Sequence, residues 1–352
     1  MLKGLKVIDL SSVLAGPSVG TFFAELGATV IKIEHPIHKD VTRTWKLPEE
    51  DPDAEISAYF ASVNYGKEYL FLDLMKEEDH TSFLKLVSEA DIVIMNFKKD
   101  DDIKLRVQDE FLLSINPRLI IGKINGYGDD SDRVAYDLVL QCESGFMSMN
   151  GTDESGPVKM PIALIDVLAA HHLKEAILLA LYKREQSGKG RVVSVSLYDA
   201  AISSLVNQAS NYLMTGQIPQ RIGSKHPNIA PYGEIFRTAD GALITFAIGS
   251  DRHFKRLCAV LDLKDLPGKN EFRTNQNRVR NRDKLASLIA EQTLKLQSTS
   301  LLEILHGEQV PAGKIMDLKE VFENDRAKAL IREELIEDIP TARVASFIFN
   351  FK

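Results

Sequence analysis

Three consecutive runs near the start of the chain, LKVIDL (5–10), GPSVGTFFAEL (16–26) and ATVIKIE (28–34), decide the fold. The two outer runs are short, apolar and rich in β-branched residues, which is typical of buried strands. The run between them is rich in small residues, and Gly16-Pro17 at its start favours a helix. A strand, a helix and a second strand in this order predict a βαβ unit with parallel strands.

The same alternation continues as far as residue 214. Further strands are expected at 70–73, 91–96, 119–125 and 192–195, and further helices at about 77–90, 102–115, 163–184 and 197–214. Alternating strands and helices favour a parallel sheet with helices on both of its faces. We therefore predict an α/β fold built on a doubly wound parallel sheet.

A change of pattern follows between residues 216 and 231, where three prolines and two glycines interrupt the periodicity. Beyond it, 232–237 and 242–248 flank Asp240-Gly241, a combination that predicts a hairpin, and helical segments are expected near 252–261, 282–296 and 300–305. These features predict a large domain over 1–215, completed by the C-terminal 325–352. Residues 216–324 would then form a linker and a smaller α+β domain.

Composition argues against several classes of protein. The 352 residues carry 43 Lys and Arg against 50 Asp and Glu, and this net charge of -7 offers no basic surface for nucleic acid. The two cysteines, Cys142 and Cys258, are far apart, so neither a disulfide framework nor a cysteine zinc site is expected. The most apolar stretch, 162–182, contains five charged or histidine side chains, so we expect no membrane-spanning helix. With Asp9 inside its apolar run, the N-terminus favours a strand over a secretory signal, and we expect a cytoplasmic protein.

Two places along the chain are candidates for chemistry. The segment SSVLAGP (11–17) follows the first strand, but it matches neither a dinucleotide fingerprint nor a Walker A loop, so a plain turn and a ligand-binding loop both remain open. Asp166 lies between apolar residues at the expected start of a long helix. It is either an N-cap or first-turn residue that stabilises the helix, or a desolvated carboxylate that acts as a nucleophile. The adjacent His171 and His172 cannot share a metal as an i, i+4 pair would, and no metal site is expected.

The whole pattern resembles the class III CoA-transferase family, which includes formyl-CoA and carnitine CoA-transferases. The matching segments occur in the family's order over nearly the whole chain. They are LKGLKVIDLSSVLAGP (2–17), ELGATVIKIEHP (25–36), NYGK (64–67), ADIVIMNF (90–97), INPRLIIGKINGYG (115–128), AYDLVLQCESG (135–145), SGKGRVVSVSLYDAA (187–201) and HPNIAPYGEIFRTADG (226–241). The resemblance implies a Rossmann-like large domain, a small domain and two chains interlocked as rings in a homodimer.

The resemblance also implies a mechanism and a set of site residues. The family's catalytic aspartate falls on Asp166, which would attack an acyl-CoA thioester to form a mixed anhydride and then an aspartyl-CoA thioester. CoA would be a substrate, exchanged between an acyl-CoA and a carboxylic acid, and no permanently bound cofactor is expected. The pattern alone allows Leu72 and Phe97 to be ordinary core residues and Lys104 an ordinary surface cation. The implied CoA contacts are Leu14, Ala15, Arg43, Leu72, Asp73, Asn96, Phe97, Lys104, Arg133, Tyr136 and Asp137.

Other activities on the same fold are separated by local sequence. The racemase branch of the family carries His in a Gly-His-Asp context, whereas this chain has Ala135-Tyr136-Asp137, which favours transfer over racemisation. Oxalate-handling members carry a run of glycines in the small domain, and 223–249 has no such run, so oxalate is not favoured as the acceptor. A family member that binds CoA without turnover is a third reading, against which the presence of Asp166 argues.

Overall fold

The computed structural model describes residues 1–350, and the chain divides into two compact units. The first unit contains Met1–Met147, Lys159–Ile218 and the chain from Ala329 onward, and the second contains Ser148–Val158 and Pro219–Lys328. Every site residue expected from the sequence belongs to the first unit. None of the helices within the described residues has the length and apolar character needed to cross a membrane.

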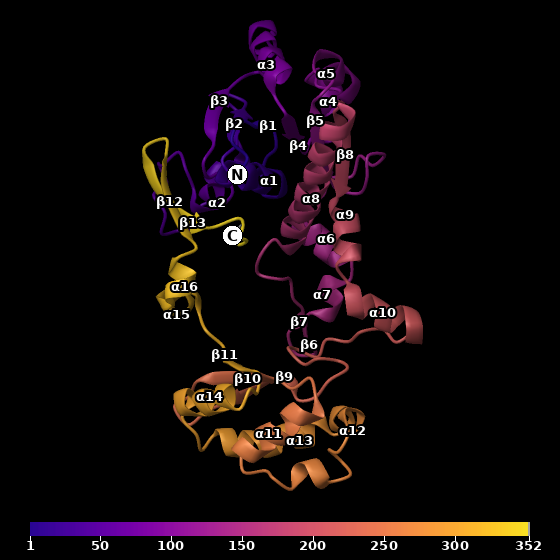
Figure 1. Cartoon of the computed structure of the whole chain (residues 1–352), viewed down its shortest axis with the longest axis vertical. Helices are drawn as coiled ribbons and strands as arrows, with labels where there is room; N and C mark the ends of the chain where they lie inside the picture. Colours follow the sequence, from indigo (N-terminus) through magenta and orange to yellow (C-terminus); the bar gives the residue numbers. More distant parts are fainter. Residues whose placement is uncertain (351–352) are drawn as a thin grey trace. The chain divides into compact units, whose positions relative to one another are not determined.

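A six-stranded parallel sheet forms the centre of the first unit (Figure 1). The central strand β1 pairs with β2 through Val7 and Val30 and with β4 through Val7 and Ile92. The predicted parallel sheet is therefore confirmed. The spatial order is β3 (Glu68–Phe71), β2 (Thr29–Glu34), β1 (Lys6–Asp9), β4 (Ile92–Met95), β5 (Ile120–Asn125) and β8 (Arg191–Ser196).

Helices cover both faces of this sheet because alternate side chains of each strand point in opposite directions. Val7 packs in one core with α1 (Ala15–Glu25), α8 (Leu164–Ser187) and α9 (Leu197–Ser203). Ile8, the next residue, packs in the other core with α3 (Glu77–Glu89) and α5 (Asp109–Ile115). The doubly wound arrangement is thus also confirmed.

Two helices expected from the sequence are each broken in the structure. The segment 102–115 is divided into α4 (Asp101–Lys104) and α5, and Arg106 between them has a φ of 57°. A left-handed residue cannot continue a right-handed helix, and the break lets Val107 turn into the core, where it is fully buried. The segment 197–214 is divided in the same way into α9 and α10 (Val206–Thr215), with a φ of 43° at Val206.

A C-terminal hairpin, which the sequence analysis did not predict, completes the first unit. Its strands are β12 (Ile331–Ile336) and β13 (Ile339–Val344), and Ile336 packs against Phe60 of α2 (Ala58–Ser62).

The remaining short helices described in the two units are η1 (Val41–Thr44), α6 (Asp137–Glu143), α7 (Phe146–Met149), η2 (Leu266–Gly268), α15 (Leu318–Glu323) and α16 (Asp325–Lys328).

The second unit has a three-stranded antiparallel sheet in the order β11 (Ala312–Lys314), β10 (Leu243–Ala247) and β9 (Tyr232–Arg237). Its own apolar core joins that sheet to surrounding helices. The hairpin of β6 (Gly151–Thr152) and β7 (Gly156–Pro157) goes with this unit, whereas the sequence analysis put residues 148–158 in the large domain. A hydrogen bond of 2.8 Å from the Gly223 N–H to the Gly151 carbonyl is one reason. The helices are α11 (Asp251–Val260), α12 (Asn275–Arg280), α13 (Arg282–Thr293) and α14 (Ser298–Gly307).

Candidate active site

A pocket of about 370 Å³ opens at the carboxyl ends of β1, β4 and β5. Its walls come from the loops that follow these three strands and from Asp166 at the start of α8. The chain winds outward in opposite directions from β1 and β4, so the pocket lies where the strand order reverses. In open α/β sheets this crevice is the usual place for a ligand.

Asp166 contributes a buried carboxylate to this pocket. It lies in the first turn of α8 and is only 8% exposed, yet its side chain has no hydrogen-bond partner among the described residues. The N-cap position belongs to Ala163, so Asp166 is a first-turn residue and not the N-cap. Burial, and then the negative charge of Asp137, raise the pKa of Asp166 to about 7. A carboxyl group with this pKa is present in both protonation states near neutral pH.

Asp137 fixes the position of the helix that carries Asp166. Its Oδ1 accepts a hydrogen bond of 2.7 Å from the Ile165 N–H, and its Oδ2 accepts one of 2.5 Å from the Gln141 side chain. The other end of the Gln141 amide accepts the Met160 N–H at 2.8 Å. The first turn of α8 and the segment before it are therefore tied to α6, and Asp137 serves this bracing without lining the pocket.

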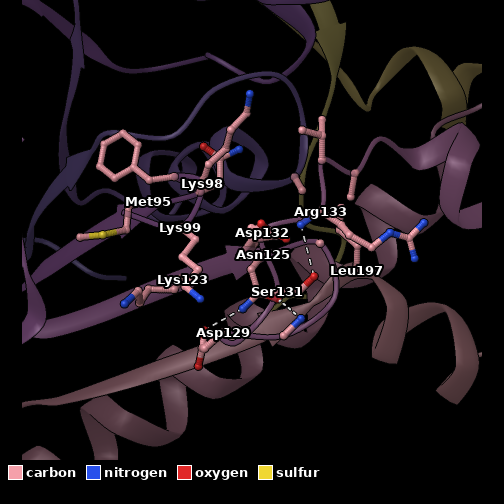
Figure 2. Close-up of a pocket in the computed structure, with 18 of the residues that line it drawn as sticks. Met95, Lys98, Lys99, Lys123, Asn125, Asp129, Ser131, Asp132, Arg133 and Leu197 are labelled. Carbon is pink, nitrogen blue, oxygen red and sulfur yellow. Dashed lines mark hydrogen bonds between the residues drawn. The ribbon is translucent and has the colours of Figure 1, made fainter. Parts of the chain in front are cut away.

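Side chains of both charges line the pocket: four cations stand beside the aspartates Asp100, Asp102, Asp129 and Asp132 (Figure 2). Lys98 and Lys99 follow β4 and are exposed, while Lys123 on β5 pairs with Asp109 at 2.7 Å. Arg133 lies in the loop after β5, where its guanidinium pairs with Glu143 at 2.7 Å and lies 4.1 Å from the centre of the Tyr127 ring. These cations can meet phosphate groups of a ligand that enters the pocket.

The loop after β5 has an internally hydrogen-bonded structure. Asn125 binds both sides of its turn, donating to Asp129 at 2.8 Å and accepting the Gly128 N–H at 2.7 Å (Figure 2). The Arg133 N–H donates to the Ser131 hydroxyl at 3.3 Å. Lys123 and the Lys98-Lys99 pair, which also line the pocket, were not among the contacts expected from the sequence. Lys98 and Lys99 follow the end of an expected strand, and this position could have singled them out, whereas Lys123 lies within a strand.

The structure brings together seven of the residues expected from the sequence. Asn96 fixes the loop after β1, because its side chain accepts the Ser12 N–H at 2.9 Å and donates to the Ser12 carbonyl at 2.8 Å. Tyr136 is exposed at the pocket. The seven lining residues are Leu14, Ala15, Asn96, Phe97, Arg133, Tyr136 and Asp166.

The other expected residues lie outside the pocket lining, and their contact with a ligand stays a prediction. Arg43 is 5% exposed, and its guanidinium pairs with Glu34 at 2.7 Å and lies over the Phe60 ring. Leu72 is buried in a core, and Asp73 accepts the Met75 N–H at 3.1 Å. Lys104 is exposed on α4, next to a lining residue. Asp137, the fifth, braces α8.

Residues 1–350 contain no group of three or more His, Cys, Asp or Glu side chains placed to hold a metal ion. His171 and His172 lie on α8, where His172 pairs with Glu175 at 3.6 Å.

A family model with the description CoA-transferase family III matches residues 2–351. The chain belongs to this family. Succinate–glutarate CoA-transferase of Agrobacterium fabrum is 38% identical over 334 residues, covering 93% of this chain and 83% of that protein. Acetyl-CoA:oxalate CoA-transferase of Acetobacter aceti is 35% identical, covering 90% of this chain and 81% of that protein. Succinyl-CoA:glutarate CoA-transferase of Homo sapiens is 31% identical, with coverages of 91% and 73%.

Solved structures agree with this membership. A CaiB/BaiF family protein from Brucella suis superposes with a TM-score of 0.85 and 37% identity, covering 99% of this chain and 92% of that one. A Mycobacterium tuberculosis protein superposes with a TM-score of 0.84 and 28% identity, with coverages of 100% and 94%. The resemblance to class III CoA-transferases is therefore confirmed, and the chain is a family III CoA-transferase enzyme.

Proposed function

We propose that this CoA-transferase moves CoA from an acyl-CoA to a carboxylic acid through covalent intermediates on Asp166. The observation that carries the proposal is the Asp166 carboxylate itself, which is buried in the pocket and lacks a hydrogen-bond partner among the described residues. A carboxylate that is not engaged by the protein keeps its lone pairs available for attack. Burial also removes the water that would otherwise hydrolyse an activated acyl group.

Carboxylates and the CoA thiolate are the nucleophiles and leaving groups in every step of the reaction. An ionised Asp166 oxygen attacks the thioester carbonyl, a C–O bond forms, the C–S bond breaks, and CoA leaves as a thiolate. The thiolate then attacks the aspartyl carbonyl of the mixed anhydride, which releases the donor acid and leaves an aspartyl-CoA thioester. An acceptor carboxylate enters by the same two steps in reverse, so the energy of the thioester is retained.

The start of α8 favours this chemistry electrostatically. Asp166 lies in the first turn of a 24-residue helix, where the helix dipole stabilises negative charge. Negative charge develops on the carbonyl oxygen during each attack, and a dipole that is fixed in advance lowers the barrier to this attack. Asp137 holds this end of the helix in place through the Ile165 N–H.

The pocket rim suits the phosphate end of CoA. Lys98 and Lys99, which line the pocket and are exposed, would pair with phosphates, while Asp166 would meet the acyl end. CoA acts here as a substrate, and the proposal requires no permanently bound cofactor.

Relatives suggest which acids to test first. Two of them are named for succinate or succinyl-CoA together with glutarate, so succinyl-CoA with glutarate is the first pair to assay. Oxalate belongs in the same screen because a relative is named for it, although 223–249 lacks the run of glycines expected for an oxalate acceptor. We further propose that the working form is an interlocked homodimer in the cytoplasm.

Hydroxylamine trapping tests the covalent step. The protein is incubated with succinyl-CoA and hydroxylamine, and peptide mass spectrometry locates the modified residue. We expect a hydroxamate on Asp166 that requires the acyl-CoA, with Asp166→Asn as the control that forms none. Transfer without any adduct on Asp166, together with an active Asp166→Asn variant, would contradict the proposal.

A further inference from the structure

Four charged side chains are buried beneath the loop that follows β1. Lys67 pairs with Asp9 at 2.7 Å, and both side chains are 0% exposed. Lys32 pairs with Asp40 at 3.2 Å, and these side chains are 0% and 1% exposed. Buried ion pairs contribute little net stability, so hydrophobic residues of similar volume would serve the core at least as well.

These charges also bind the backbone of the loop Ser11–Leu14. Lys32 Nζ donates to the Ser11 carbonyl at 2.8 Å, and Asp9 accepts the Ser11 N–H at 3.0 Å. Asp40 accepts the Val13 N–H, with its nearer oxygen at 3.2 Å. The loop therefore rests on charged groups whose own positions are fixed by one another.

Val13 has an unusual backbone conformation in this loop. Its φ is 72°, in the left-handed region that β-branched residues avoid because their side chains crowd the backbone. Such a residue persists only where its surroundings hold it, and strain of this kind concentrates at ligand sites. Ser12, Val13, Leu14 and Ala15 all line the pocket.

We propose that the buried Lys32–Asp40 pair is a positioning device that holds Val13 in its left-handed conformation and thereby shapes the ligand pocket. This inference rests on the proposed function, because the ligand is taken to be CoA. Asp40 acts through Val13 and touches no ligand itself.

The position of Asp40 is itself secured from its own segment. The Asp40 N–H donates to Glu34 at 2.8 Å, and its carboxylate caps η1 by accepting the Thr42 N–H at 3.0 Å. Asp40 thus links the end of β2 through its backbone N–H, and its carboxylate links η1 to the pocket loop. If Asp40 only neutralised Lys32, replacing Asp40 would weaken ligand binding equally whether or not residue 13 can adopt its left-handed conformation without strain.

A double-mutant cycle with Asp40→Asn and Val13→Gly separates these roles. Glycine adopts a φ of 72° without strain, so a loop with Gly at this position no longer needs to be held. We expect Asp40→Asn to weaken CoA binding, measured by calorimetry, about tenfold, and to raise KM for acyl-CoA more than it lowers kcat. In the Val13→Gly background the same change should weaken binding only about twofold. An equal effect in both backgrounds would overturn the proposal.

Two further measurements keep the test decisive. Amide exchange of the peptide 10–15, measured without ligand, should be faster in Asp40→Asn than in the wild type. Unchanged exchange would count against the positioning role of Asp40. A wild type that binds no CoA would refute the proposed function only, and the exchange measurement would still test the positioning role. Arg184→Met is the matched control, since it removes a buried cation that pairs with Asp91 at 3.0 Å outside the pocket, and CoA affinity should not change. If Asp40→Asn fails to fold, Lys32→Met with Asp40→Asn removes both charges and carries the same cycle.

Discussion

The Asp137 carboxylate accepts the Ile165 N–H at 2.7 Å and so holds the residue that immediately precedes Asp166. This hydrogen bond places two carboxylates near each other at the start of one helix. Asp137 fixes the helix end, while its charge, after burial, helps to raise the pKa of Asp166. Position and protonation state of the proposed nucleophile are thus set partly by the same neighbour.

Replacing Asp166 by Asn should abolish transfer and stabilise the free protein. The pKa of Asp166 is about 7 in the folded state against an ordinary 3.8, so the folded state keeps a proton that the unfolded state releases. The free energy of unfolding of the wild type therefore falls as pH rises from about 4 to about 7.

The variant has no carboxyl group to ionise here, so its free energy of unfolding should exceed that of the wild type. This difference should grow from about pH 4, and reach its full value of at most about 4 kcal/mol above pH 7. Urea unfolding at several pH values measures it, with circular dichroism to confirm the fold. Transfer activity should fall at least about 1,000-fold. A variant with substantial activity, or one that is less stable than the wild type at pH 8, would count against the assignment.

Replacing Asp137 by Asn should shift the acidic limb of the rate profile to lower pH. The nucleophile must be ionised, so wild-type kcat/KM should fall as pH drops through about 7. Removing the negative charge of Asp137 lowers the pKa of Asp166, and the limb should move down by about half a pH unit.

Tyr59 also interacts with this carboxylate, and its pKa is raised to about 12 by burial and then by Asp166, so it stays neutral over this range. Because Asn keeps an acceptor for the Ile165 N–H, Asp137→Ala is the comparison that removes the brace as well. A limb that stays in place in Asp137→Asn would show that the charge of Asp137 does not act on Asp166.

The protein should be a homodimer that does not dissociate without unfolding. Apolar side chains are exposed on two helices of the first unit, including Leu179 and Tyr182 of α8 and Leu213 and Met214 of α10. Burying them against a second copy would remove this surface from water. Light scattering should give twice the chain mass of 39.3 kDa at all concentrations, and a folded monomer on dilution would reject the dimer.

The protein should not exchange the α-proton of a 2-methylacyl-CoA with solvent. Racemisation needs an acid and a base on opposite faces of the α-carbon with pKa values near working pH. Tyr136 stands where the racemase branch has His, and a phenol is a far weaker acid than an imidazolium, so it is a poor substitute. Mass spectrometry in deuterium oxide measures exchange. Rapid deuterium incorporation without an acceptor acid, lost in Tyr136→Phe, would favour the racemase activity.

The parallel sheet and the family could be predicted from the sequence because both depend on local patterns. Runs such as LKVIDL (5–10) and ADIVIMNF (90–97) contain the strands β1 and β4, and their apolar character alone identifies them as buried. Asp166 could be singled out because it interrupts an apolar run at the expected start of a helix. The breaks at Arg106 and Val206 could not be seen, since periodicity on either side continues across them.

Which expected residues meet in the pocket was decided by the tertiary structure. The family resemblance implied that Arg43 contacts CoA, but its guanidinium pairs with Glu34 and with Glu337 at 3.0 Å, a residue near the other end of the sequence. The conformation of Val13 likewise depends on Asp40, which follows the next strand. Sequence patterns report the local preference of the backbone and the burial of each position. The partner that a buried charge finds depends on which distant segments the folded sheet brings beside it, and no local pattern contains that information.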